Sequence, residues 1–267
     1  MTEPLIRFDD GAAYDDYMAP WSRSVGIEFL QWLAQPAGLR WLDVGCGTGA
    51  FTQLLLAHAA PALVHGIDPS AAQIGFARQR VDASVAHFAL GDAMALDYPA
   101  GAFDAAVMAL VIFFVPEPGR SVVEMARVVR PGGTVAAYAW DMAGGGFPYM
   151  VLGQQMRLLG LATPMPPSVE ASDPEVMRQL WRAAGLQAVT TKAFTVQRRF
   201  ADFESYWNIA SKWTSVRQIL SCLPAPVLAS LKRGVQDQIL PDPDGQITIT
   251  ARAHACMGRV AAPNSRP

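Results

Sequence analysis

The residues with the clearest chemical potential lie in WLDVGCGTGAFT at Trp41–Thr52, where an apolar run ends in Asp43 and a glycine-rich turn follows. The turn contains three glycines without a Cβ, which lets the backbone come within contact distance of a ligand: Gly45, Gly47 and Gly49. The Asp43 carboxylate suits a positively charged amino group and would repel a pyrophosphate. Asp43 could instead cap the next helix or accept hydrogen bonds from loop amides. The turn also fits the dinucleotide-binding pattern if Ala50 fills its last position, so an NAD-dependent oxidoreductase stays an alternative.

Two further acidic residues follow apolar runs. Nineteen residues after Gly49, ALVHGI ends at Asp68, a spacing at which a carboxylate can accept hydrogen bonds from both hydroxyls of a ribose. The run VAHFAL ends just before Asp92, which can accept a hydrogen bond from an adenine amino group. Taken singly, Asp68 could cap a helix and Asp92 could be a solvated turn residue. Three acidic strand ends in succession favour a nucleoside-containing cofactor.

The elements that must position these residues alternate between residues 39 and 140. Short apolar runs and helix-like segments follow one another in a βαβαβ rhythm, which predicts a mainly parallel sheet. The strands are nearly continuous apolar runs, as expected when helices cover both faces. Outside this core we expect helices at 26–33, 173–184 and over most of 201–238, a strand at 187–200 and an edge strand at 246–255.

Four segments carry a resemblance to a known family. WLDVGCGTG, HGIDPS, LGDAMALDYPAGAFDAAV and EMARVVRPGGTVAAYAW occur in the order found in class I S-adenosylmethionine-dependent methyltransferases. The sequence most resembles the branch of ubiquinone and menaquinone biosynthesis methyltransferases, as does YDDYMAPWSR ahead of the core. The resemblance implies an α/β fold with a Rossmann-like, seven-stranded, mainly parallel sheet, an antiparallel last strand and helices on both faces. It also implies S-adenosyl-L-methionine as cofactor and S-adenosyl-L-homocysteine as product.

We expect one methyltransferase domain over residues 1–267. Its expected parts are an N-terminal helical cap (1–38), a cofactor-binding core (39–140), mostly helical lid or substrate segments (141–172 and 201–245), and the C-terminal part of the sheet (173–200 and 246–256).

The resemblance also implies roles for individual residues. It assigns Asp43 and the turn from Gly45 to Gly49 to the methionine end of the cofactor, and Asp68 to the ribose. Arg23 lies in a segment that folds over the cofactor in similar enzymes, where it would pair with the methionine carboxylate; a surface helix packed on the core is the alternative. Asp92 and the Ala93 backbone are assigned to adenine, Pro69 to the face of that ring, and Met108–Leu110 to the sulfonium side. The predicted cofactor-binding residues are Tyr14, Arg23, Asp43, Gly45, Cys46, Gly47, Asp68, Pro69, Gln73, Asp92, Ala93 and Ala109.

The acceptor is less well defined by the sequence. Many relatives carry a His-His pair after the fourth strand, where this chain has Phe113 and Phe114, which predicts an apolar cavity wall. No catalytic residue is assigned, and the candidates for a base are Tyr14, Tyr17 and His254. Aromatic residues outside the core would either form a lid over an apolar or aromatic acceptor or pack as a helical core: Phe147, Tyr149, Phe203, Tyr206, Trp207 and Trp213.

Composition limits the remaining possibilities. With 21 basic and 23 acidic residues, the chain has no excess positive charge for a phosphate backbone, so nucleic acid is not expected as a partner. Three widely spaced cysteines and separated acidic residues predict neither a disulfide framework nor a metal site. The longest apolar run, Ala105–Val115, is far shorter than the roughly 20 residues of a membrane span. The acidic N-terminus lacks the features of a secretory signal, so we expect a cytoplasmic location.

These features predict methyl transfer from S-adenosylmethionine to the O, N or C atom of a small, apolar or aromatic acceptor. A protein that binds S-adenosylmethionine as a sensor or regulator without turnover is the alternative, and the oxidoreductase ranks below both. The sequence leaves the oligomeric state open.

Overall fold

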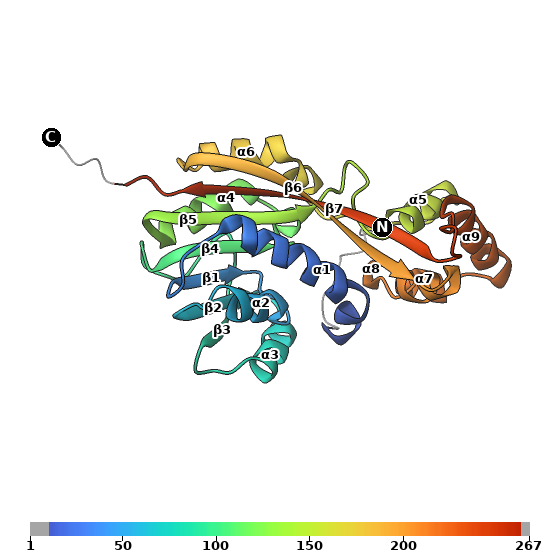
Figure 1. Cartoon of the computed structure of the whole chain (residues 1–267), viewed down its shortest axis with the longest axis horizontal. Coiled ribbons are helices and arrows are strands. Elements are labelled where there is room, and N and C mark those ends of the chain that lie inside the picture. The colour runs from blue at the N-terminus through green and yellow to red at the C-terminus, as the bar shows by residue number, and fades with distance from the viewer. Residues whose placement is uncertain (1–10, 263–267) are drawn as a thin grey trace.

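The computed structural model describes residues 11–262, with side chains from residue 17 onward. Seven strands form one mixed sheet in the order β3-β2-β1-β4-β5-β7-β6 (Figure 1). The strands are β1 Arg40–Val44, β2 Leu63–Asp68, β3 Ala86–Leu90, β4 Phe103–Ala109, β5 Val129–Trp140, β6 Gln187–Phe200 and β7 Ile247–Arg259. β7 is antiparallel to both of its neighbours, whereas β1 to β5 pair in parallel. The predicted Rossmann-like fold with an antiparallel last strand is confirmed.

The strand order fixes where a ligand can bind. The chain starts in the middle of the sheet at β1, runs outward through β2 to β3, and then returns to β4 on the other side of β1. The connections after β1 and β4 therefore leave in opposite directions, and such a switch point opens a crevice at the carboxyl ends of the strands. The glycine turn after β1 lies at this point.

Helices cover both faces of the sheet (Figure 1). On one face lie α1 Gly11–Leu33, α2 Ala50–His58 and α3 Ala71–Arg80, with α1 in contact with the other two. On the other face, α4 Pro118–Val128 and α6 Pro174–Ala183 pack against the strands and each other. The predicted start of α6 is confirmed, because the Asp173 carboxylate accepts hydrogen bonds from the backbone N–H groups of Glu175 and Val176.

Four more helices form a helical module at one end of the sheet: α5 Met150–Leu158, α7 Phe203–Ala210, α8 Thr214–Ser221 and α9 Ala225–Gln238 (Figure 1). Its aromatic side chains pack against one another. Phe147 contacts Tyr149 and Trp213, and Tyr149 in turn contacts Tyr206. These ring contacts agree with a packed helical core, the second of the two arrangements offered for these aromatic residues, rather than with a lid over the acceptor.

The module is joined to α1 by buried hydrogen bonds. The Tyr149 hydroxyl accepts from Trp21 Nε1 at 3.1 Å and donates to the Tyr17 carbonyl at 2.6 Å. The Tyr17 hydroxyl lies 3.0 Å from Thr214 Oγ1. The first part of α1 is thereby fixed to the helical module.

β5 begins at Val129 and includes the Pro131–Gly133 run, which forms an irregularity in the pairing with β4. A Cβ at Gly133 would lie 2.5 Å from the Asp104 carbonyl oxygen, so this close approach requires glycine. β7 continues to Arg259, beyond the predicted end at residue 255. The prediction of an edge strand is wrong, because β7 lies between β5 and β6. Within residues 11–262, the structure contains no helix with the length and apolar character of a membrane span.

Candidate cofactor and acceptor site

The glycine turn joins β1 to α2 and is tied to the next strand. The backbone N–H groups of Gly45 and Cys46 donate to the Ile67 carbonyl at 2.8 and 2.9 Å. Gly45 has φ 76° and Gly47 has φ 52°, a left-handed conformation that L side chains rarely adopt. A Cβ at Gly45 would lie 2.6 Å from the Val111 side chain, whereas at Gly47 only Gln73 Oε1 would come within 4 Å. Gly45 therefore allows close packing, and Gly47 presents its backbone to open space.

Asp68 closes the turn from the end of β2. Its carboxylate accepts hydrogen bonds from the Gly47 N–H at 3.0 Å and the Ser70 N–H at 2.9 Å. Burial raises the pKa of Asp68 above its usual value, against the effect of these two bonds. The cap of α3 is Ser70, whose hydroxyl accepts from the Gln73 N–H. Asp68 thus orders the turn and is not the cap of the helix.

Asp43 lies behind the glycine turn rather than in the wall of a cavity. It is fully buried, and Thr52 Oγ1 donates to its Oδ2 at 2.7 Å. Its Oδ1 is buried without a hydrogen-bond partner in the described part of the chain. Burial raises the pKa of Asp43 to about 7; the Thr52 hydrogen bond lowers it, and the charge of Asp68 raises it. Such an oxygen suits a cationic donor that comes from outside the chain.

A cavity of about 1330 Å³ opens above these residues. Of the predicted cofactor-binding residues whose side chains are described, all except Asp43 line it: Arg23, Gly45, Cys46, Gly47, Asp68, Pro69, Gln73, Asp92, Ala93 and Ala109. Asp92 also accepts a hydrogen bond from the Met94 N–H at 2.8 Å, as expected for a turn aspartate. Tyr14 belongs to α1, and its side chain lies outside the described residues. The structure thus brings the acidic ends of β2 and β3 and the glycine turn to one cavity.

A second part of the cavity is largely apolar. Ala19 and Pro20 of α1, and Phe51 and Leu54 of α2, contribute to it. The segment after β4 adds its wall through Leu110, Val111, Phe114, Val115 and Pro116. Phe114, but not the buried Phe113, lines this space, in agreement with the predicted apolar wall. These apolar residues of α1 and α2 were not predicted, because helical spacing alone does not show which apolar positions face a cavity.

Among the described residues, Tyr138 supplies an aromatic hydroxyl to the cavity wall. It lies near the end of β5, is 1% exposed, and was not predicted. Its place near a strand end, next to the switch point, is the signal by which it could have been found.

Two of the three suggested bases, Tyr17 and His254, do not line the cavity, and the side chain of the third, Tyr14, lies outside the described residues. None of the four histidines lines the cavity, and all of them lie in the described part of the chain. His254 Nδ1 is 3.0 Å from the Ser172 carbonyl oxygen, and Tyr17 bonds to the helical module. Among the described residues, the cavity therefore offers shape and polarity rather than a histidine base.

Comparison with known proteins identifies the family. Residues 42–137 match the model of a methyltransferase domain. Ubiquinone biosynthesis O-methyltransferase of Aromatoleum aromaticum is 33% identical over 168 residues, covering 59% of this chain and 69% of that protein. Demethylmenaquinone methyltransferase of Symbiobacterium thermophilum is 39% identical over 97 residues, 34% of this chain and 39% of that protein. The chain belongs to the class I S-adenosylmethionine-dependent methyltransferases, which sets the oxidoreductase aside.

Solved structures share the fold of this chain. Phosphoethanolamine N-methyltransferase 2 of Haemonchus contortus, solved in complex with S-adenosyl-L-methionine, superimposes with a TM-score of 0.58 at 15% identity, covering 96% of this chain and 60% of that one. The chain spans between 25% and 49% of the length of the other curated relatives. Their acceptors differ in kind, from quinols to fatty acids and phospholipids by their names.

The residues present fit S-adenosylmethionine. The partnerless Oδ1 of Asp43 matches the need of an ammonium group for an acceptor. The open side of Gly47 leaves room for a ligand where a Cβ would otherwise project. Asp68 and Asp92 present two carboxylates to the same cavity, at neighbouring strand ends.

Proposed function

We propose that this methyltransferase acts on a small, apolar or aromatic molecule and methylates it on an O, N or C atom. One observation carries the proposal: a single cavity joins the glycine turn and strand-end acids to an apolar wall. Cofactor and acceptor can therefore meet in one cavity. Apolar pockets with a few convergent polar groups are typical sites for such molecules.

The cofactor half is assigned by the chemistry of its residues. Asp43 would attract the ammonium group through its charge from behind the glycine turn. Asp68 would accept from the ribose hydroxyls, and Asp92 with the Ala93 backbone would hold adenine. Pro69 would cover one face of that ring. Arg23 is exposed and lines the cavity from α1, where it would pair with the methionine carboxylate.

The acceptor half of the cavity would orient the acceptor and exclude water from the reacting atoms. When bound, S-adenosylmethionine supplies an electrophilic methyl group on a positively charged sulfur. Transfer of that methyl group to the acceptor would yield S-adenosylhomocysteine, the methylated acceptor and a proton. Holding the two reactants in line contributes roughly 7–11 kcal/mol of barrier reduction. The Phe114 and Phe51 side chains would exclude water from the reacting atoms.

A methyl-transfer assay tests the proposal. The protein is incubated with S-adenosylmethionine carrying a labelled methyl group and a panel of phenols, quinols, amines and charged polar compounds. Label should appear in apolar aromatic acceptors and be lost in Asp68→Ala, while Asp237→Ala, an exposed carboxylate in α9, should match the wild type. Transfer to charged polar compounds alone would contradict the acceptor class. Tight cofactor binding without transfer to any compound would favour the sensor role instead.

A further inference from the structure

The apolar wall of the cavity is a loop whose buried backbone carbonyl groups need hydrogen-bond donors. Residues Ile112–Phe114 form the short helix η1, and Val115 and Pro116 follow it. The side chains of Phe114, Val115 and Pro116 face the cavity, while Val115 is only 5% exposed. Buried carbonyl groups of such a loop have no strand or helix partners of their own and need donors from elsewhere.

One residue supplies those donors. The Ser168 N–H donates to the Phe113 carbonyl at 3.1 Å. Its hydroxyl donates to the Val115 carbonyl at 2.8 Å and approaches the Pro116 carbonyl at 3.4 Å. Ser168 is 2% exposed and lies 53 residues from Val115 along the chain. A single serine thus contacts three carbonyl groups of this loop.

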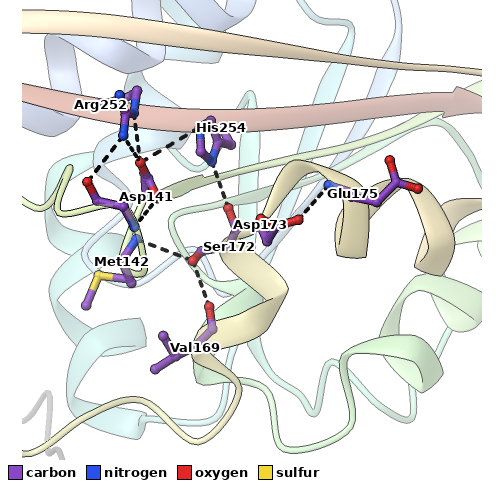
Figure 2. A network of polar contacts seen from close by, with 9 residues as sticks. Asp141, Met142, Val169, Ser172, Asp173, Glu175, Arg252 and His254 are labelled. Carbon is purple, nitrogen blue, oxygen red and sulfur yellow. Dashed lines mark hydrogen bonds and ion pairs between the residues drawn. The ribbon is translucent and has the colours of Figure 1, made fainter.

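Ser168 is held by the adjoining helix η2, which is itself hydrogen-bonded to the sheet. It precedes the short helix η2, Val169–Ser172, and its carbonyl accepts from the Ala171 N–H at 2.9 Å. Ser172 Oγ donates to the Val169 carbonyl at 2.7 Å and accepts from the Met142 N–H at 3.3 Å (Figure 2). These bonds tie η2 to the end of β5.

A second set of contacts ties η2 to β7. His254 on β7 places Nδ1 3.0 Å from the Ser172 carbonyl oxygen (Figure 2). Asp141, directly after β5, accepts from Arg252 Nε at 2.7 Å and from the Gly144 N–H at 2.7 Å. The support of Ser168 is therefore fixed to two adjacent strands of the sheet, and so is the position of the wall.

We propose that Ser168 is a positioning residue that sets the shape of the acceptor half of the cavity and thereby selects acceptors. The inference rests on the proposed function, since it takes the wall to face the acceptor. The glycine turn and Asp68 are held by contacts between β1, β2 and α3, independently of Ser168. Removal of the Ser168 hydroxyl should therefore loosen the wall and leave cofactor binding intact.

Hydrogen–deuterium exchange tests the positioning without any acceptor. The wild type, Ser168→Ala, Ser168→Thr and Ser121→Ala are compared with S-adenosylhomocysteine bound. Ser121 is the matched control, because it is a fully buried serine whose hydroxyl donates to the Pro118 carbonyl within its own helix α4. Amides of residues 111–117 should exchange about tenfold faster in Ser168→Ala, near the wild-type rate in Ser168→Thr, and unchanged in Ser121→Ala. Equal exchange in Ser168→Ala and the wild type would overturn the proposal.

Kinetics with 4-alkylcatechols of increasing chain length test selectivity. At saturating S-adenosylmethionine, Ser168→Ala should raise the acceptor KM about tenfold and change the preferred chain length, with kcat and the cofactor KM nearly unchanged. Ser168→Thr should restore the wild-type preference. A fall in kcat with an unchanged acceptor KM would contradict the proposal. If the wild type methylates none of these catechols, they are not its acceptors, and the exchange experiment alone decides the role of Ser168.

Discussion

Replacement of Asp43 by Asn tests the electrostatics of the site. The carboxylate is fully buried, and burial raises its pKa from 3.8 to about 7. The Asn side chain has nearly the same shape, and its carbonyl oxygen can still accept the hydrogen bond that Thr52 Oγ1 makes at 2.7 Å. The substitution therefore removes the ionisable group and keeps the neighbouring contact.

The magnitude follows from the difference between the folded and unfolded pKa. A difference of about three pKa units corresponds to about 4 kcal/mol at roughly 1.4 kcal/mol per unit. Because the folded pKa is the higher one, the folded state binds the proton more tightly, and the contribution of Asp43 to stability falls as the pH rises from about 4 to about 7. Asp43→Asn should therefore be up to about 4 kcal/mol more stable than the wild type at pH 8, with little of this difference left at pH 4.

Urea unfolding of both proteins at pH 4 and pH 8, without ligand, measures this difference. Calorimetric titration with S-adenosylhomocysteine at pH 8 should move in the opposite direction: Asp43→Asn should bind about tenfold more weakly, because an ionised partner of the ammonium is lost. Asp237→Asn, on the exposed surface of α9, should change neither quantity. A stability difference that does not depend on pH would refute the burial argument, and unchanged ligand affinity would refute the attraction between Asp43 and the ammonium group.

Two further substitutions test the packing that holds the site. Gly45→Ala should destabilise the protein by about 1–3 kcal/mol and weaken S-adenosylhomocysteine binding, because φ is 76° and the new Cβ would lie 2.6 Å from the Val111 side chain. Adding Val111→Ala should recover part of the stability measured by urea unfolding. No recovery would contradict the steric explanation. Tyr149→Phe should lower the free energy of unfolding by about 1–3 kcal/mol, since Trp21 Nε1 loses its acceptor, and leave S-adenosylhomocysteine affinity unchanged in calorimetry. An equal loss of ligand affinity would mean that the helical module shapes the cofactor half of the cavity.

Much of the fold was predictable because its signals are local. Continuous apolar runs alternating with helical segments define the parallel strands, and Asp173 followed by Pro174 marks the start of α6. The start of β5 at Val129 was not predictable, because a run such as Pro131–Gly133 is typical of a turn. Here its pairing with β4 continues through an irregularity that only the neighbouring backbone explains.

The site divides in the same way. Asp68 and Asp92 were found because a parallel sheet brings the carboxyl ends of its strands together. The burial of Asp43 behind the turn, and its raised pKa, depend on packing against Thr52 and could not be predicted. Ser168 left no trace in the sequence, because its partners are more than 50 residues away.

Calorimetric titration of the wild type and Asp68→Ala with S-adenosylhomocysteine, and separately with NAD, tests the central claim most directly. The wild type should bind S-adenosylhomocysteine and not NAD. Asp68→Ala should bind at least about tenfold more weakly, because it loses the proposed ribose contact and the hydrogen bonds of the turn. Unchanged binding by Asp68→Ala, or a preference for NAD, would contradict the assignment of this cavity as the S-adenosylmethionine site.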